Sequence, residues 1–180
     1  SELVATAPTA NEPLIAFRKR AATKTTEAHN KHAREIGQLL GPLVKHLPFD
    51  SFVGPSRLKN PSTEYKYLQA LAIEIRKELR LDPTAPIKFE DLIGKFAQLH
   101  AVVVPVMWGQ KSRHENAVHI YLPESKTTWI YLNLDSRLHD FKFWMAHELG
   151  HLLSVDLLER GETELAEDFA DSFAGALLYP

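Results

Sequence analysis

The 180-residue chain contains no cysteine. This absence excludes a disulfide framework, a cysteine nucleophile and any metal site built from thiolates. A metal ion bound by this chain therefore has to be held by histidine, aspartate or glutamate side chains. The sequence offers nine histidines and 23 acidic residues for such a site.

Long apolar runs and a strong net charge are missing too. No stretch approaches the roughly 20 apolar residues of a transmembrane helix. The first residues lack the basic and apolar segments of a secretion signal, and the formal net charge is −2. We therefore expect a cytoplasmic protein with no membrane partner and no direct nucleic-acid binding by this segment. The chain begins at Ser1 rather than Met, as a fragment, a processed chain or a tagged chain would.

The N-terminal third has the composition of a linker followed by a helix. Residues 1–27 mix proline, threonine and alanine with a small basic cluster, so little fixed structure is predicted there. A helix is predicted from about Glu27 to Leu47, with a break or kink at Gly41-Pro42. We therefore divide the chain into a linker and N-terminal helical segment, residues 1–56, and a domain over residues 57–180.

The next part of the chain changes from helical to strand periodicity. Helices are predicted over residues 60–81 and 89–99, and strands over residues 101–107, 117–122 and 127–134. Asn60 is the predicted N-cap of the first helix and Pro61 its first residue. The turn residues at 123–126 predict an antiparallel hairpin. Pro105 cannot donate to a ladder, which predicts an edge strand.

Two helices complete the pattern. Asp135 or Ser136 is predicted to cap a helix that runs to about Val155, and residues 161–163 precede a final helix. The sequence therefore predicts an α+β domain. Its three-stranded, mostly antiparallel sheet packs against these two helices, and the N-terminal helices are added to it.

The residues that carry chemistry form the motif His147-Glu148-Leu149-Gly150-His151. Histidines four residues apart lie one above the other on a helix and can bind one Zn²⁺ ion together. Glu148 can act as the general base that takes the proton of a zinc-bound water. The helix is apolar nearly all round, and burial of its polar residues would cost several kcal/mol unless a metal compensated them.

Two histidines do not complete a zinc site, and a third ligand has to come from elsewhere. Metzincins have glycine and histidine where this chain has Ser154 and Leu157, so that class is excluded. Glu167 and Asp171 share a helix face at i, i+4, which is typical of gluzincins. There, a glutamate binds the metal and an aspartate accepts a hydrogen bond from the first histidine. Asp156 and Glu159 remain weaker alternatives for the ligand.

The other seven histidines show no ligand spacing beyond the pair His29 and His32, and a surface or core role is the better interpretation for each. They are His29, His32, His46, His100, His114, His119 and His139. If their strands flank the cleft, His114, His119 and Tyr131 could reach the oxyanion of a transition state.

A longer string of residues surrounds the motif. It runs from Ile130-Tyr131-Leu132-Asn133 through Phe143-Trp144-Met145-Ala146 and the motif itself to Glu167, Ala170-Asp171, Phe173-Ala174, Leu177-Leu178 and Pro180. This string resembles the ImmA/IrrE family of bacterial and phage metallopeptidases, over roughly the last 120 residues. Members typically show a strand, an aHELGH-like helix and then E..A(N/D).FA..LL.P.

The resemblance implies a small zincin-like domain that binds Zn²⁺, with Mn²⁺ as an alternative ion. His147, His151 and Glu167 would be ligands and Glu148 the catalytic base. The implied substrate is a helix-turn-helix repressor, cut to switch on stress, mobile-element or toxin-antitoxin operons. Residues 13–20 are similar to the linker after an XRE-type DNA-binding domain in fused members. Such a domain would precede this chain, and many relatives continue beyond Pro180.

Three functional hypotheses follow. The first is a zinc-dependent endopeptidase, whose substrate could add as a strand to a sheet edge beside the cleft. The second is a non-catalytic metal-binding sensor or regulatory module of an XRE-type transcription factor. Glu148 favours the enzyme, since a scaffold has no need of it, whereas the linker-like start favours the regulator. The third is an inert partner domain, which predicts no bound metal.

Overall fold

A mixed four-stranded sheet forms the centre of the computed structural model, which describes residues 13–19, 27–47, 58–106, 115–133 and 141–179. The strands are β1 (Leu14–Lys19), β2 (Ala101–Val106), β3 (Glu115–Leu122) and β4 (Thr127–Asn133). Their order in the sheet is β1-β3-β4-β2. β3 pairs antiparallel with both β1 and β4, while β2 runs parallel to β4. The predicted α+β class and the β3–β4 hairpin are confirmed.

The strand β1 corrects two predictions. The segment expected to have little fixed structure contains a strand, and the sheet has four strands rather than three. Residues 14–17, Leu-Ile-Ala-Phe, are apolar and suit a strand, but the neighbouring prolines and basic cluster obscured this signal. Pairing with β3 satisfies the backbone groups of β1 that point toward β3. The segment placed at 1–56 therefore contributes a strand to the sheet of the segment placed at 57–180.

Pro105 lies in β2, the last strand of the sheet on the side opposite β1. β2 pairs with β4 alone among the described strands. A proline is tolerated at such an edge because its missing N–H is not needed by a second neighbour. The prediction of an edge strand is confirmed.

Helices cover both faces of this sheet. They are α1 (Glu27–Leu40), the 3₁₀-helix η1 (Gly41–His46), α2 (Tyr65–Glu78), α3 (Phe89–Gln98), α4 (Phe141–Leu153), α5 (Val155–Glu159) and α6 (Thr163–Leu178). The change from α-helix to 3₁₀-helix at Gly41 confirms the predicted break. The predicted caps Asp135 and Ser136 lie outside the described residues. No helix in the described segments has the length and apolarity needed to cross a membrane.

The start of α2 differs from the prediction. The helix begins at Tyr65 after the N-cap Glu64, not at Pro61, and it ends at Glu78. Asn60 has a positive φ of 50°, and the hydroxyl of Ser62 accepts a hydrogen bond from the N–H of Glu64 at 3.1 Å. This local bond holds the chain in a turn, which competes with helix formation in the segment before Tyr65.

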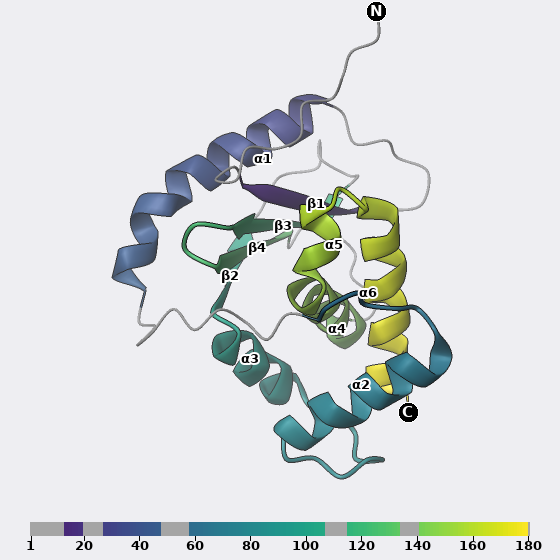
Figure 1. Cartoon of the computed structure of the whole chain (residues 1–180). Helices are drawn as coiled ribbons and strands as arrows, with labels where there is room; N and C mark the ends of the chain where they lie inside the picture. The colour runs from purple at the N-terminus through teal and green to yellow at the C-terminus, as the bar shows by residue number, and fades with distance from the viewer. Residues whose placement is uncertain (1–12, 20–26, 48–57, 107–114, 134–140, 180) are drawn as a thin grey trace, which may run out of the picture.

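The two faces of the sheet bury different residues, as the alternation of strand side chains requires. Ile130 and Leu132 join the core formed with α2, α3, α4 and α6. Trp129 and Tyr131 belong to a second core that includes residues of α1. Figure 1 shows α1 on one side of the sheet and α4 with α6 on the other. The motif helix therefore lies against one face of the sheet, within the larger core.

Arg76 joins α2 to the end of α6. Its Nε and Nη2 donate to the backbone oxygen of Leu177 at 3.0 and 2.8 Å, and its Nη1 donates to that of Ala85 at 2.6 Å. The side chain is fully buried. A buried guanidinium is tolerated when its donors find acceptors, and here it satisfies one of the last carbonyl groups of α6.

Candidate metal centre

The helix α4 places His147 and His151 on the same face, one turn apart. Their Nε2 atoms lie 3.0 Å from each other, and both side chains are 1% exposed. The two ring nitrogens therefore face each other on the buried side of α4. The spacing seen in the sequence has thus produced a converging pair on the buried helix.

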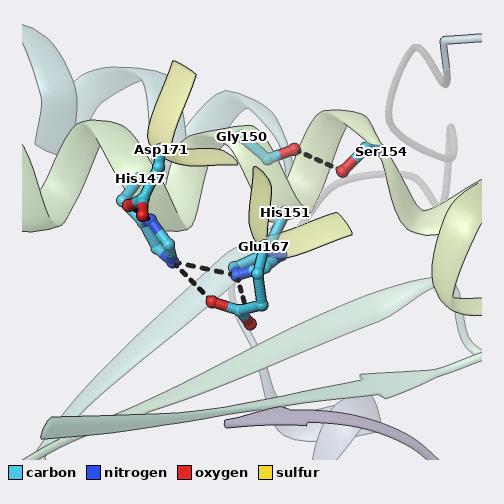
Figure 2. Close-up of polar contacts among 6 residues, drawn as sticks. All are labelled: His147, Gly150, His151, Ser154, Glu167 and Asp171. Atoms are coloured by element: carbon cyan, nitrogen blue, oxygen red, sulfur yellow. Dashed lines mark hydrogen bonds and ion pairs between the residues drawn. The ribbon is translucent and has the colours of Figure 1, made fainter. Parts of the chain in front are cut away.

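Glu167 of α6 completes the cluster. Its Oε2 lies 3.5 Å from Nε2 of His147, and its Oε1 lies 3.2 Å from Nε2 of His151. Ligand atoms of these three residues all lie within 4.8 Å of one another. Figure 2 shows the three side chains pointing toward one another on the side of α4 that faces the sheet. A buried His147, His151, Glu167 cluster of this kind could hold a metal ion.

Gly150 lets α6 approach α4 closely enough to form this cluster. A Cβ atom added at Gly150 would lie 2.8 Å from Cα of Ala170, a distance that real Cβ atoms do not tolerate. Ala170 follows Glu167 by one helical turn on α6. The absence of a side chain at position 150 therefore sets the distance between the helix with the two histidines and the helix with the glutamate.

The spacing of the three side chains is close to that of ligands around a small metal ion. Nitrogen and oxygen ligands at about 2.1 Å in tetrahedral geometry lie about 3.4 Å from one another. The two Nε2 atoms are 3.0 Å apart, and those of His151 and His147 lie 3.2 and 3.5 Å from Oε1 and Oε2 of Glu167, respectively. Two imidazoles and one carboxylate supply nitrogen and oxygen donors of the kind that transition-metal ions accept.

Asp171 fixes the orientation of His147. Its Oδ1 lies 2.7 Å from Nδ1 of His147, as Figure 2 also shows. In the tautomer that suits metal binding, Nδ1–H donates to this carboxylate and leaves the lone pair of Nε2 directed at the cluster. The side chain of Asp171 is 63% exposed, so the bond runs from the buried cluster to the surface.

The electrostatics of Glu167 favour its ionised form. Burial raises the pKa of this carboxyl, but hydrogen bonds and electrostatic interactions with His147 and His151 lower it by more than burial raises it. The net result is a pKa well below the ordinary value for glutamate. Glu167 therefore faces the two histidines as a carboxylate, which is the form that binds a metal ion.

The structure separates the alternative ligands from the cluster. Asp156 and Glu159 lie on α5 and do not belong to the set of converging ligand atoms. Asp156 instead forms an ion pair with Arg160 at 3.6 Å. Of the acidic residues weighed as third ligand, Glu167 is the one that the fold brings to the histidines.

Glu148, the predicted base, lies on α4 beside His147 and is 1% exposed. A carboxylate is rarely buried so deeply without a functional or structural reason. Glu148 directly follows His147 on the helix whose two histidines converge.

Of the two described residues that were expected to reach an oxyanion, His119 lies on the face of the sheet toward α4 and Tyr131 does not. The ring centroid of His119 is 5.6 Å from that of His151, and the side chain is 1% exposed. Burial, followed by the charge of His151, lowers its pKa well below the ordinary value and outweighs the opposing effect of Glu167. Tyr131 belongs to the core on the other face. His114 lies outside the described residues.

The strand periodicity groups His119 with Ala117 on one face of β3 but does not tell which face meets α4. In β3, Val118, Ile120 and Leu122 pack in the core that includes α1, so the alternate residues face α4. His119 therefore shares a face with Ala117, which packs in the core of the motif helix. Knowing which face of β3 meets the motif helix would have distinguished His119 from the other histidines.

Comparison of the chain with protein-family models, curated proteins and solved structures found no match.

Proposed function

We propose that this chain is a zinc-dependent peptidase of the ImmA/IrrE type. The observation that carries the proposal is the convergence of His147, His151 and Glu167 within one buried cluster, with Glu148 on the same helix. A motif helix packed between a mixed sheet and a ligand helix is also the arrangement expected of a zincin-like domain. Together these features support hydrolysis of a peptide bond by an activated water.

The roles proposed for the side chains follow from their positions. A bound Zn²⁺ or Mn²⁺ ion would act as a Lewis acid on the peptide carbonyl and lower the pKa of water. Glu148 accepts the proton of the attacking water and passes it to the leaving amine. Asp171 keeps the ring of His147 in the required tautomer through the 2.7 Å contact.

An extended substrate could pair with one of two strands of the sheet, β3 or β2. β3 carries His119, whose ring is close to that of His151. However, the side of β3 away from β4 is already paired with β1. A peptide could add to β3 only by displacing β1, whereas β2 has no second partner among the described strands. Strand addition at the β3 edge would bring an extended peptide to the cluster.

The substrate class rests on the family resemblance. We therefore propose a helix-turn-helix repressor as the substrate, in a stress, mobile-element or toxin-antitoxin operon. This proposal requires a protein partner and no contact between this chain and nucleic acid.

One observation favours the second hypothesis, a metal-binding regulatory module without catalysis. The segment similar to an XRE linker is β1, and it pairs along β3, with Ala16 opposite His119. A change at the cluster could therefore reach a preceding DNA-binding domain through this strand. In that case Glu148 would have no catalytic role.

Incubation of the zinc-loaded chain with the repressor encoded beside it separates the two hypotheses. The peptidase proposal expects cleavage by the wild type and none by Glu148→Gln, although the variant still binds zinc. Asp168→Asn, which changes an exposed carboxylate on α6, serves as the matched control and should cleave like the wild type. Intact repressor after incubation with zinc-loaded wild type would favour the regulatory module.

A further inference from the structure

His119 is a buried polar side chain that the proposed mechanism leaves without a role. It lies in the middle of β3, is 1% exposed, and neither of its ring nitrogens has a hydrogen-bond partner among the described residues. Buried polar groups in folded proteins are nearly always hydrogen-bonded, because leaving one unpaired costs free energy. An imidazole retained in this state next to a candidate metal centre therefore calls for an explanation.

His119 lies too far from the cluster of His147, His151 and Glu167 to be a fourth ligand, but close enough to contact a bound substrate. It does not belong to the set whose ligand atoms all lie within 4.8 Å of one another. Its ring centroid is nevertheless 5.6 Å from that of His151. A group bound beside His151 and Glu167 would come within reach of a ring nitrogen of His119.

We propose that His119 is a substrate-contacting residue, whose ring N–H donates a hydrogen bond to the carbonyl oxygen of the peptide group held beside His151 and Glu167. This inference rests on the proposed peptidase function. Negative charge develops on that oxygen during hydrolysis, and a fixed donor in a site without water stabilises it.

Burial does not place His119 out of reach of a peptide. His147, Glu148 and His151 are equally buried, at 1% exposure each, so a substrate that reaches them has to open the same region. Ala16 of β1 is the partner of His119 across the β1–β3 pairing. β1 thus runs along β3 next to His119. Displacement of β1 would open a path to the imidazole ring of His119.

The test uses the full zinc-loaded chain and acetohydroxamate, a small probe that binds zinc and carries a carbonyl oxygen. His119→Leu removes the donor, whereas His119→Gln retains an N–H group. Ile120→Val is the matched control, because its side chain lies on the other face of the same strand. For each variant, zinc per chain is measured after dialysis, folding is checked by circular dichroism, and the Kd for acetohydroxamate is determined by titration calorimetry.

The inference predicts that His119→Leu binds acetohydroxamate about ten-fold more weakly than the wild type, with zinc content unchanged. His119→Gln should lose less, and Ile120→Val should match the wild type. If His119→Leu does not fold, weaker acetohydroxamate binding by folded His119→Gln than by the wild type supports the inference.

An unchanged Kd in the folded variants would overturn the inference. Loss of zinc from the His119 variants would also overturn it, because His119 would then support the ligands. Failure of the zinc-loaded wild type to bind acetohydroxamate would overturn it too. Absence of zinc from the wild type itself is a separate result, because it would refute the proposed function.

Discussion

Gly150 on α4 and Ala170 on α6 are in backbone contact, and a Cβ at position 150 would lie 2.8 Å from Cα of Ala170. We therefore expect Gly150→Ala to push the two helices apart. Overpacking of this kind costs about 1–3 kcal/mol of unfolding free energy, and it would separate Glu167 from the histidines. Thermal unfolding and zinc competition titrations should show lower stability and weaker zinc binding together.

The control for this substitution is Gly94→Ala on α3, where an added Cβ would meet no atom within 4 Å. Alanine is the better helix former, so this variant should be unchanged or more stable by up to about 1 kcal/mol. Equal effects of the two substitutions would contradict the role given to Gly150.

Asp171 is predicted to affect metal binding and not folding. Removal of a carboxylate that orients a metal-bound histidine typically weakens binding about 10- to 100-fold. Because the side chain is 63% exposed, Asp171→Ala should leave the unfolding free energy of the metal-free protein nearly unchanged. Competition with a chromophoric chelator measures the zinc affinity, and Asp168→Ala on the same helix is the control. Wild-type zinc affinity in Asp171→Ala would show that the contact with His147 is incidental.

Arg76 is predicted to be essential for stability. Arg76→Met removes donors to the backbone oxygens of Leu177 and Ala85 and leaves both acceptors unpaired. We expect a loss of about 3 kcal/mol in urea-induced unfolding. Lys77→Met, an exposed change on the same helix, should alter stability by no more than about 0.5 kcal/mol. Similar stability of the two variants would argue against the buried network.

The register of β1 can be tested because the chain has no cysteine. Ile15 and Ile120 are directly opposite each other across the β1–β3 pair. The double variant Ile15→Cys/Ile120→Cys should form an intrachain disulfide on mild oxidation, detected by thiol titration and mass. In the control Ile15→Cys/Ile130→Cys, the second residue lies on β4 and faces the other core, so both thiols should stay reduced. A cross-link in the control alone would refute the pairing.

The sequence predicted the parts of this fold that are encoded locally. The hairpin of β3 and β4, the break at Gly41 and the convergence of His147, His151 and Glu167 were predicted from turn residues, proline chemistry and helical spacing. Glycine in a helix interior costs about 1 kcal/mol relative to alanine, and at Gly150 the close approach of Ala170 explains why a larger residue is not accommodated.

The features that sequence reasoning missed depend on contacts between distant segments. Pairing with β3 stabilises β1, although its own composition resembles a linker. The position of His119 near His151 depends on which face of β3 meets α4, and no local pattern specifies that choice. The late start of α2 reflects competition from the Ser62–Glu64 hydrogen bond, which outweighed the preference of proline for the first helical position.

The most direct test of the central claim is the zinc content of the purified chain after incubation with Zn²⁺ and exhaustive dialysis. The account predicts close to one zinc per chain in the wild type and in the control His32→Ala, whose exposed side chain lies on α1. Zinc should be lost in His147→Ala and in Glu167→Ala. A wild type without zinc, or zinc retained by both cluster variants, would contradict the claim that His147, His151 and Glu167 form a metal centre.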